Sequence, residues 1–295
     1  MLLSGADLRS AVRSLTRAPA FFALSCGTIA LGVGLTSGVF SVVNAVLLRP
    51  LPYEDPGRLM VVGKIWGSLV EPNGASEPEI LDWRERSRTF AGLEFTERVN
   101  MLVDAAGVPE WFVGARASRG LIDLLGVRPL LGRTFGPEED QAGRHFVALI
   151  SERLWRSRFA ADTDVIGRRV RLSPNGTDAT DTYEIIGVLP QDVPIDYRTP
   201  FDIVVPFVFS DIPRASGARR TASLQVIGRL GPGAAQEQAS EEMRAVATVL
   251  NREYPMGIRG ASVAVRPLHA HTLEAVAGSR SSCSRPSSSC WRLRL

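Results

Sequence analysis

Cysteine is scarce in this sequence and absent from its middle. The three cysteines are Cys26, Cys283 and Cys290, so residues 50–280 contain none. Without cysteine, that stretch can form neither a disulfide framework nor a cysteine-ligated zinc site. The absence does not identify a compartment, because exported domains are not obliged to carry disulfides.

Motifs for catalysis are missing as well. No GxxxxGK[ST] loop occurs, so the chain cannot act as an ATPase through a P-loop. Ser151 lacks a GxSxG context and fits a helix N-cap better than a nucleophile. His145 has no visible catalytic partner. We therefore predict no catalytic residue, no cofactor and no enzyme activity.

Metal-ligand candidates are few. His269 and His271 would share one face of a strand, but Glu274 is the only further ligand nearby, and a metal site needs more. We expect an exposed or tail-adjacent histidine pair and no metal site. The acidic run at 138–140 could suggest a cation site. Directly after Pro137 it better fits the first turn of a helix, where negative charge opposes the dipole.

Other binding signals are weak. Trp83, Trp111 and Trp155 could line a ligand site, but core packing is the better prediction. The sequence Asn175-Gly176-Thr177 matches a glycosylation sequon and is predicted to be a turn. The net charge is +3, yet no basic stripe interleaves with aromatic residues. We therefore expect no nucleic-acid partner.

One long apolar run stands out. Residues 18–48 include no charged side chain over 31 positions. As a helix the run would reach about 46 Å, more than the roughly 30 Å hydrocarbon core of a bilayer. It is too long for the apolar region of a cleaved signal peptide, and a soluble core helix is rarely apolar on every face. We predict a retained transmembrane helix over 18–48.

Flanking charges predict how this helix is oriented. Arg9, Arg13 and Arg17 recur every four residues before the run, and arginines near a span favour the cytoplasmic side. We predict that residues 1–17 form a cytoplasmic amphipathic segment in contact with the lipid bilayer; a solvated helix would fit the same residues. The chain after Leu48 then lies outside the cytoplasm.

Small residues recur within the run. Ala30, Gly34 and Gly38 are spaced every four positions, which leaves one helix face open to close approach by another helix. We predict a helix-packing face there. A permease with several helices would use such a face, whereas a lone anchor would not need it.

Residues 49–270 alternate strand and helix patterns. Strands are predicted at 58–66, 92–104, 108–116, 145–151, 164–173, 181–190, 200–207, 222–230 and 261–268. Helices are predicted at 76–87, with a capping box from Ser76 and Glu79, at 118–125, after Ser151, and at 234–252.

These elements predict an α+β fold. The helix between the strands at 222 and 261 suggests a βαβ-type layer. We expect one strand-rich domain over 49–270, with a second subdomain inserted at about 90–200. The tail at 271–295 is rich in Ser, Arg and Cys and is predicted to be disordered.

Several of these segments occur together in a known family. In order they are LLGVRPLLGRTFGPEED, VALISERLWRSRF, DVIGRRVRL, YEIIGVLP, DIVVPF and VIGRLGPGAAQEQASEEMRAV. They resemble the MacB-like periplasmic core domain of FtsX-like ABC-transporter permeases, especially the duplicated permeases of acidobacteria. The likeness extends over about residues 5–270 and so covers only the N-terminal part of such a permease.

The resemblance implies a membrane component of an ABC transporter in the bacterial inner (plasma) membrane. Its partners would be a separate ABC ATPase subunit and a second permease copy or half. Its extracytoplasmic domain would couple ATPase-driven motion to export or mechanotransmission. Because the family pattern continues into further helices, we expect a truncated or frame-shifted permease. A membrane-anchored binding module without transport activity is the alternative, and an exported hydrolase is a third reading with no nucleophile–base pair to support it.

Overall fold

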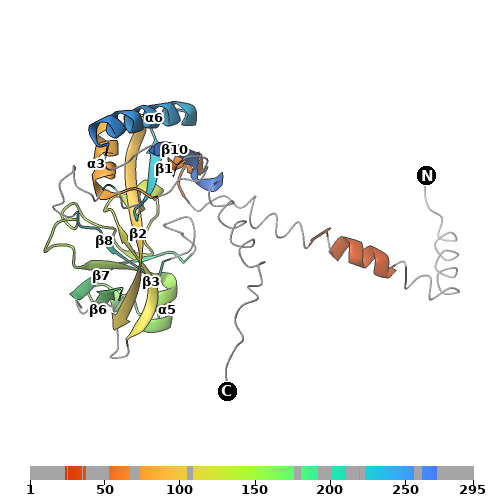
Figure 1. Ribbon diagram of the computed structural model, residues 1–295. Helices are drawn as coiled ribbons and strands as arrows, with labels where there is room; N and C mark the ends of the chain where they lie inside the picture. The colour runs from red at the N-terminus through yellow and green to blue at the C-terminus, as the bar shows by residue number, and fades with distance from the viewer. Residues whose placement is uncertain are drawn as a thin grey trace, which may run out of the picture. The chain divides into compact units, whose positions relative to one another are not determined.

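The computed structural model describes much of the chain between residues 53 and 270, together with part of an N-terminal helix (Figure 1). The described residues are 24, 26–34, 36–37, 53–66, 74–104, 109–175, 181–191, 201–209, 219, 223–255 and 261–270. The chain divides into two units, Met1–Pro50 and Leu51–Leu295.

The first unit contains an exposed apolar helix. Its described residues at 24, 26–34 and 36–37 are helical. Its exposed apolar side chains include Leu24, Ile29, Leu31 and Val33. None of the helices formed by the described residues is long and apolar enough to cross a membrane. The predicted span at 18–48 extends beyond these residues on both sides, so it stays a prediction.

The second unit is built on one mixed sheet. Its described strands are β1 (Leu59–Trp66), β2 (Phe90–Asp104), β3 (Glu110–Ala117), β4 (Leu131–Gly132), β5 (Val147–Ser151), β6 (Arg169–Pro174), β7 (Asp181–Leu189), β8 (Ile203–Pro206), β9 (Gln225–Leu230) and β10 (Ala261–Pro267). Their order is β10-β1-β9-β2-β3-β8-β5-β7-β4, and β6 pairs with both β2 and β7. The helical elements are η2 (Pro56–Arg58), α3 (Glu77–Arg86), α4 (Leu121–Leu125), α5 (Glu152–Phe159), η3 (Thr163–Val165) and α6 (Gln236–Glu253).

A split crossover forms one end of the sheet. Strand β1 pairs antiparallel with both β9 and β10, so β9 and β10 run parallel to each other with β1 between them. Helix α6 connects β9 to β10, which confirms the predicted βαβ-type layer. Figure 1 shows α6 and α3 together on this end of the unit, beside β1 and β10.

Strand β1 is apolar at successive positions because both of its faces are covered. Met60 and Val62 lie in the same hydrophobic cluster as side chains of α3 and α6. Leu59 and Val61 point the other way, into a cluster that includes residues of α4. Alternate side chains of a strand face opposite sides, so burial on both faces explains a run that a half-exposed strand would interrupt with polar residues.

Strand β2 runs through both halves of the domain. Its first part contributes Leu93 and Phe95 to the cluster beneath α3 and α6. Its second part contributes Val99 and Met101 to a different cluster, which contains residues of α5, β5 and β7. The proposed subdomain at 90–200 stays a prediction. The observed sheet is continuous from β9 into β2, which is the first strand of that segment.

Most sequence-predicted elements are found close to their expected positions. The strands predicted at 92–104 and 108–116 are found as β2 and β3, which pair antiparallel with Thr96 opposite Ala117. The helix predicted at 118–125 starts later, at Leu121, and ends as expected at Leu125, directly before Gly126, whose φ is 70°. Glycine adopts this left-handed conformation without strain and commonly ends helices.

The predicted helix start at the acidic run 138–140 is wrong. The segment forms turns, in which the amide of Glu139 donates to the carbonyl of Gly136 at 3.3 Å. A few residues on, Gly143 has a φ of 85°. A helix cannot pass through a left-handed residue, so the turns that follow Pro137 do not extend into a helix.

Candidate functional site

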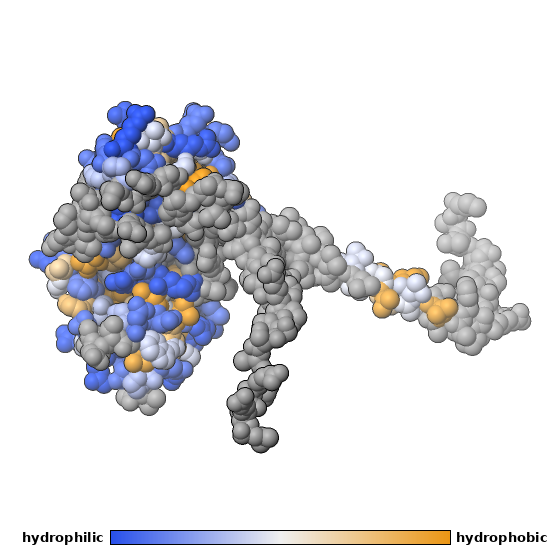
Figure 2. Space-filling model, viewed as in Figure 1, coloured by the Kyte–Doolittle hydropathy of each residue, from blue (hydrophilic) through white to orange (hydrophobic). Residues whose placement is uncertain are grey.

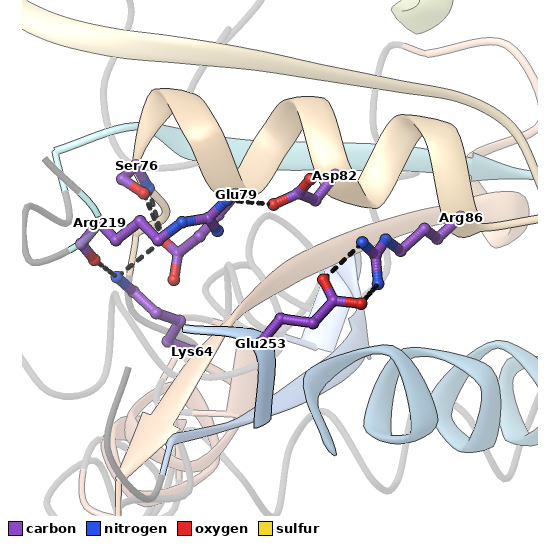
Figure 3. Close-up of polar contacts among 7 residues, drawn as sticks. All are labelled: Lys64, Ser76, Glu79, Asp82, Arg86, Arg219 and Glu253. Carbon is purple, nitrogen blue, oxygen red and sulfur yellow. Dashed lines mark hydrogen bonds and ion pairs between the residues drawn. The ribbon is translucent and has the colours of Figure 1, made fainter. Parts of the chain in front are cut away.

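A cluster of buried charges lies where β1, α3 and α6 meet. Lys64 of β1, Glu79 and Asp82 of α3, and Arg219 each expose 1% or less of their surface. Figure 3 shows them together with Ser76 and with the Arg86–Glu253 pair. We name Lys64, Glu79, Asp82 and Arg219 the buried ion cluster.

Glu79 is held by three donors on the first turn of α3 and on β1. Its Oε2 accepts hydrogen bonds from the amide and the hydroxyl of Ser76, at 2.8 and 2.7 Å. Lys64 Nζ lies 2.9 Å from the same oxygen. The capping box predicted from Ser76 and Glu79 is confirmed. Lys64 therefore supplies a positive charge that ties this helix start to the sheet.

Asp82 and Arg219 form the second buried pair. The guanidinium Nη2 of Arg219 lies 2.5 Å from Asp82 Oδ2. The guanidinium also lies over the ring of Tyr254, 3.7 Å from its centroid. Tyr254 follows directly after the last residue of α6. Arg219 therefore contacts both helices at once, which fixes the end of α6 relative to α3.

A surface pair repeats this link between the helices. Arg86 near the end of α3 donates two hydrogen bonds to Glu253 of α6, at 3.0 and 2.7 Å. The hydrogen bond from Arg86 lowers the pKa of Glu253 below its ordinary value. Exposed pairs contribute little energy, so the buried pairs dominate the electrostatics at this end.

The chemistry of the cluster is structural. Each carboxylate has a cation within hydrogen-bonding distance, so both carboxylates are already engaged in ion pairs. The buried Oε1 of Glu79 accepts no hydrogen bond from the described residues. A buried pair of this kind favours one arrangement of its elements over others more than it adds stability.

Only some of the candidate metal ligands lie among the described residues. Within the described ranges, no group of three His, Cys, Asp or Glu side chains could hold a metal ion. His269 belongs to a helical turn at 268–270 that follows β10, so its expected position on a strand is wrong. His271 and Glu274 lie outside the described residues.

The acidic run is neutralised by arginines. Glu138 pairs with Arg144, Asp140 with Arg119 at 3.1 Å, and Glu139 with Arg133 at 2.6 Å. Burial by itself raises the pKa of Glu139, but hydrogen bonds from Arg133 and from the amide of Gly136 outweigh it, and the net pKa lies below the ordinary value. These carboxylates already have cationic partners, which argues against a cation site.

The serine and histidine candidates have structural surroundings. The hydroxyl of Ser151 accepts from the amide of Leu154 at 3.1 Å, which confirms its predicted role as the N-cap of α5. His145 stacks on Phe146, with 4.3 Å between ring centroids. Neither side chain is placed beside the other as a nucleophile–base pair would require.

The three tryptophans have different environments. Trp83 is buried in the core, as predicted. Trp155 is half-buried and donates from Nε1 to the carbonyl of Asp162 at 2.7 Å. Trp111 is 55% exposed, so the core prediction is wrong for it. It sits on β3 beside a partly exposed face of the hairpin, where an aromatic side chain can remain in contact with water.

Two remaining candidates are only partly described. Asn175 lies in a turn with φ 54°, in line with the predicted turn, whereas Gly176 and Thr177 lie outside the described residues. Ala30 and Gly34 are helical and exposed. Gly38 lies outside the described residues. The helix-packing face therefore stays a prediction.

The outer surface around the cluster is largely hydrophilic. Figure 2 shows hydrophilic residues over α6, whereas the opposite half of the visible face mixes polar and apolar residues. Exposed large apolar side chains in this unit include Trp111, Leu130, Ile166 and Val249. Single exposed apolar residues are normal for a globular surface.

Comparison with known families identifies the domain. Residues 22–246 match the family described as the MacB-like periplasmic core domain. This chain belongs to that family. The match begins at residue 22, within the apolar run at 18–48, and ends within α6, so the MacB-like domain includes both the buried ion cluster and most of the sheet. No curated protein matches the chain.

One solved structure shares the fold of this chain, and two others show a weaker similarity. A domain from Porphyromonas gingivalis that is described as part of a permease protein is 17% identical, covers 73% of this chain and 92% of that chain, and has a TM-score of 0.52. The extracellular domain of the noncanonic ABC-type transporter YknZ from Gram-positive bacteria is 16% identical, with coverages of 70% and 98% and a TM-score of 0.49. The periplasmic region of MacB from Actinobacillus actinomycetemcomitans is 9% identical, with coverages of 78% and 94% and a TM-score of 0.49.

Sequence reasoning missed the buried ion cluster. Ser76 and Glu79 form a local capping box that the sequence predicts, but the pattern around Lys64 predicts only a strand. Arg219 pairs with a carboxylate 137 positions away. The available signal was a lysine in the middle of an apolar strand, since buried lysine is rare unless it is paired.

Proposed function

We propose that this chain is a permease component of a MacB/FtsX-type ABC transporter. In this proposal its extracytoplasmic domain couples motion driven by a separate ATPase subunit to export or mechanotransmission. The observation that carries the proposal is the family match over residues 22–246, which joins part of the apolar run at 18–48 to the sheet domain. The chain would act as a binding and coupling component, with no covalent chemistry of its own.

The proposal includes a membrane helix over residues 18–48. The sequence supports it because the run has no charged residue and the described helical part exposes its apolar side chains. Exposed leucine, isoleucine and valine along a helix are stable where lipid surrounds them. Arg9, Arg13 and Arg17 favour a cytoplasmic N-terminus in the bacterial inner membrane.

The partners follow from the same arrangement. The small residues Ala30, Gly34 and Gly38 would form the face on which a helix of a second permease copy or half packs. Motion at the cytoplasmic side would come from an ABC ATPase, since this chain has no P-loop. The domain outside the membrane would then move with its attached helix.

Topology is the first test. Single cysteines are placed at Ser4→Cys and Ala142→Cys in a full chain whose native cysteines are replaced by serine. We expect an impermeant maleimide to label the Ala142→Cys variant in spheroplasts, while labelling of Ser4→Cys requires permeabilised cells. Recovery of the chain in the soluble fraction, or the reverse labelling pattern, would overturn the membrane assignment.

Partnership with an ATPase is the second test. The full chain is purified in mild detergent from its native host after crosslinking. We expect an ABC ATPase subunit to co-purify, and its ATP hydrolysis to change when the chain is present. A membrane-inserted chain that captures no ATPase and leaves ATP hydrolysis unchanged would favour the membrane-anchored binding module.

A further inference from the structure

The first described residues after the N-terminal unit, Tyr53 and Glu54, are already in contact with the sheet domain. Tyr53 is buried against the core, only three positions after Pro50, where the first unit ends. The amide of Glu54 donates to the carbonyl of Leu125, the last residue of α4, at 3.3 Å. The chain therefore meets the domain at a defined place, next to the end of α4.

Arg229 of β9 holds this place from the sheet side. Its Nη2 donates to the carbonyl of Glu54 at 2.6 Å and to that of Leu124 at 2.8 Å. Its Nε donates to Leu124 at 2.9 Å, and its Nη1 reaches the carbonyl of Asp55 at 3.4 Å. One guanidinium therefore joins the entering chain, the end of α4 and a strand of the sheet.

Arg58 makes the reciprocal contact. It belongs to η2, which follows the entering residues, and it donates from Nε and Nη2 to the carbonyl of Leu230, at 3.0 and 2.5 Å. Arg58 of the entering segment thus donates to β9, and Arg229 of β9 donates to the entering segment. We name Arg58, Arg229 and the carbonyls that they bind the entry clamp.

Burial and neighbouring charges both act on Arg229 in the clamp. Burial lowers the pKa of Arg229 below its ordinary value, and the nearby Arg58 lowers it further. Arginine remains protonated in proteins even so. Two cations close together are tolerated here because backbone carbonyls accept their donors and because the carboxylates of Glu54 and Asp55 lie nearby. Among them is the carbonyl of Leu124, at the end of α4, where helical carbonyls otherwise lack partners.

The position of β9 in the sheet determines which strands a force on the clamp would load. Arg229 lies opposite Leu59 of β1 on one side and opposite Gly92 of β2 on the other. Both neighbouring strands are therefore hydrogen-bonded to the strand that carries the clamp. Strand β2 has buried residues in the cluster beneath α3 and α6 and in the cluster that contains residues of α5. A displacement of β9 therefore reaches both of these clusters.

We propose that the entry clamp is the connection through which a displacement of the N-terminal segment is passed to the sheet. This inference rests on the proposed function, in which residues 18–48 form a moving membrane helix. Arg229 is the positioning residue: it holds the entering chain against β9, so that a pull applied before residue 53 acts on the sheet. Without it, the same pull first peels the entering segment away from the domain.

The test is single-molecule pulling of the full chain in two geometries. One handle is attached at the C-terminus in both, and Cys283 and Cys290 are replaced by serine. The second handle is attached at Cys26 in the first geometry. In the second geometry it is attached at Ala142→Cys, in an exposed turn, with Cys26→Ser. Only the first geometry loads the domain through the entering segment.

We expect R229Q to lower the force of the first rupture within the domain when the pull comes from Cys26. The released length should correspond to peeling of the entering segment. With the pull from position 142, R229Q should behave like the matched control R244Q, which alters an exposed arginine of α6. R229K should resemble R229Q, because one ammonium cannot replace a fork that bridges three carbonyls.

The outcomes separate a positioning role from general stability. A loss of rupture force that is equal in both geometries, or absent in both, overturns the inference. If R229Q does not fold, R58Q removes the reciprocal contact from the partly exposed entering side and is read in the same way. The pulling result needs neither an ATPase nor transport. The proposed function can therefore fail its labelling and co-purification tests while the clamp still carries load, and the reverse can also occur.

Discussion

At the scale of single residues, the domain places full charges inside its core. Lys64 and Glu79 are buried together, and so are Asp82 and Arg219. Such pairs are expensive to desolvate, and removing one partner is more damaging than replacing both. The domain accepts this arrangement because each pair ties α3 to another part of the chain: Lys64 lies on β1, and Arg219 also contacts Tyr254 after α6.

Replacing Lys64 tests this coupling. We expect K64M to lower the free energy of unfolding by about 3–5 kcal/mol, because Glu79 loses its cation while it stays buried. In K64M/E79Q most of that loss should be recovered, since a glutamine side chain can still accept from Ser76. Chemical denaturation of the three variants in a double-mutant cycle, with E79Q as the third, measures the coupling. A loss in K64M/E79Q that equals the sum of the losses in K64M and E79Q would show that the pair is not coupled.

The carboxylate of Glu242 makes the free energy of unfolding depend on pH. Glu242 of α6 accepts hydrogen bonds from the amides of Arg88 and Thr89, at 2.8 and 3.0 Å, and from the Thr89 hydroxyl. Burial raises the pKa of Glu242, but the hydrogen bonds from Thr89 and Arg88 outweigh it and the net pKa is lowered. Its contribution to stability is therefore present at neutral pH and is lost as the pH falls through the lowered value.

We expect E242A to lose about 1–2 kcal/mol of unfolding free energy at pH 7, the usual effect of removing a charged acceptor. The difference from the unaltered chain should shrink as the pH falls below about 4, where protonation removes the same interaction. E241A, on an exposed position of the same helix, serves as the control. A difference that stays constant from pH 7 to pH 3 would contradict this account.

At the scale of elements, the short strand β4 depends on a close backbone approach. A Cβ added at Gly132 would lie 2.1 Å from the carbonyl oxygen of Ile186 in β7, and Gly132 has a φ of 76°. Gly143 has a φ of 85° but open space around it. The two glycines therefore separate the effect of backbone strain from that of steric contact.

We expect G143A to lower stability by about 1–2 kcal/mol, the usual penalty of left-handed backbone for a residue with a Cβ. G132A should lose more, because a carbonyl cannot move aside like a flexible side chain. It should also speed amide hydrogen exchange at Arg133, whose amide donates to Ile186 at 3.0 Å. Thermal unfolding and hydrogen exchange provide the comparison. Equal losses of stability in the two variants would mean that β4 moves away from Ile186 at no energetic cost.

Elements were predictable where their signals are local. The cap at Ser151, the capping box at Ser76 and the stop at Gly126 each depend on residues within a few positions. Helix α6 was expected at 234–252 and is found at Gln236–Glu253, because a repeated apolar period makes long helices easy to recognise. The turns at 138–140 were missed, since the proline and acidic residues match a helix start whether or not a helix follows.

Long-range pairings escaped the sequence. Nothing local tells that β3 pairs with β8 in parallel or that β6 bridges β2 and β7. The same holds for the candidate site and the clamp. Arg219 meets Asp82 across 137 positions, and Arg229 meets Glu54 across 175. Specific partners at such separations are set by how the whole sheet is ordered.

At the scale of the whole molecule, strand β2 connects the two hydrophobic halves. Trp83 belongs to the cluster beneath α3 and α6, and Trp155 packs against the cluster that includes α5. A strand with buried residues in both clusters should couple their unfolding. Independent subdomains would instead unfold separately.

In a variant of the full chain that keeps only Trp83, and in one that keeps only Trp155, we expect fluorescence and circular dichroism of the same variant to give one urea midpoint. The tryptophans removed from each variant are replaced by phenylalanine. Far-ultraviolet circular dichroism of each variant supplies the reference transition. Two distinct midpoints would instead show that the segment at 90–200 is a separately folding subdomain.

The pairing of β1 with β10 also bears on how such a domain is acquired. Met60, at the start of the first strand, lies opposite Pro267, at the end of the last. Antiparallel partners sit only about 5 Å apart. A domain whose first and last strands lie side by side can be inserted into another polypeptide at a single point. The host segments before and after the insertion then stay close together.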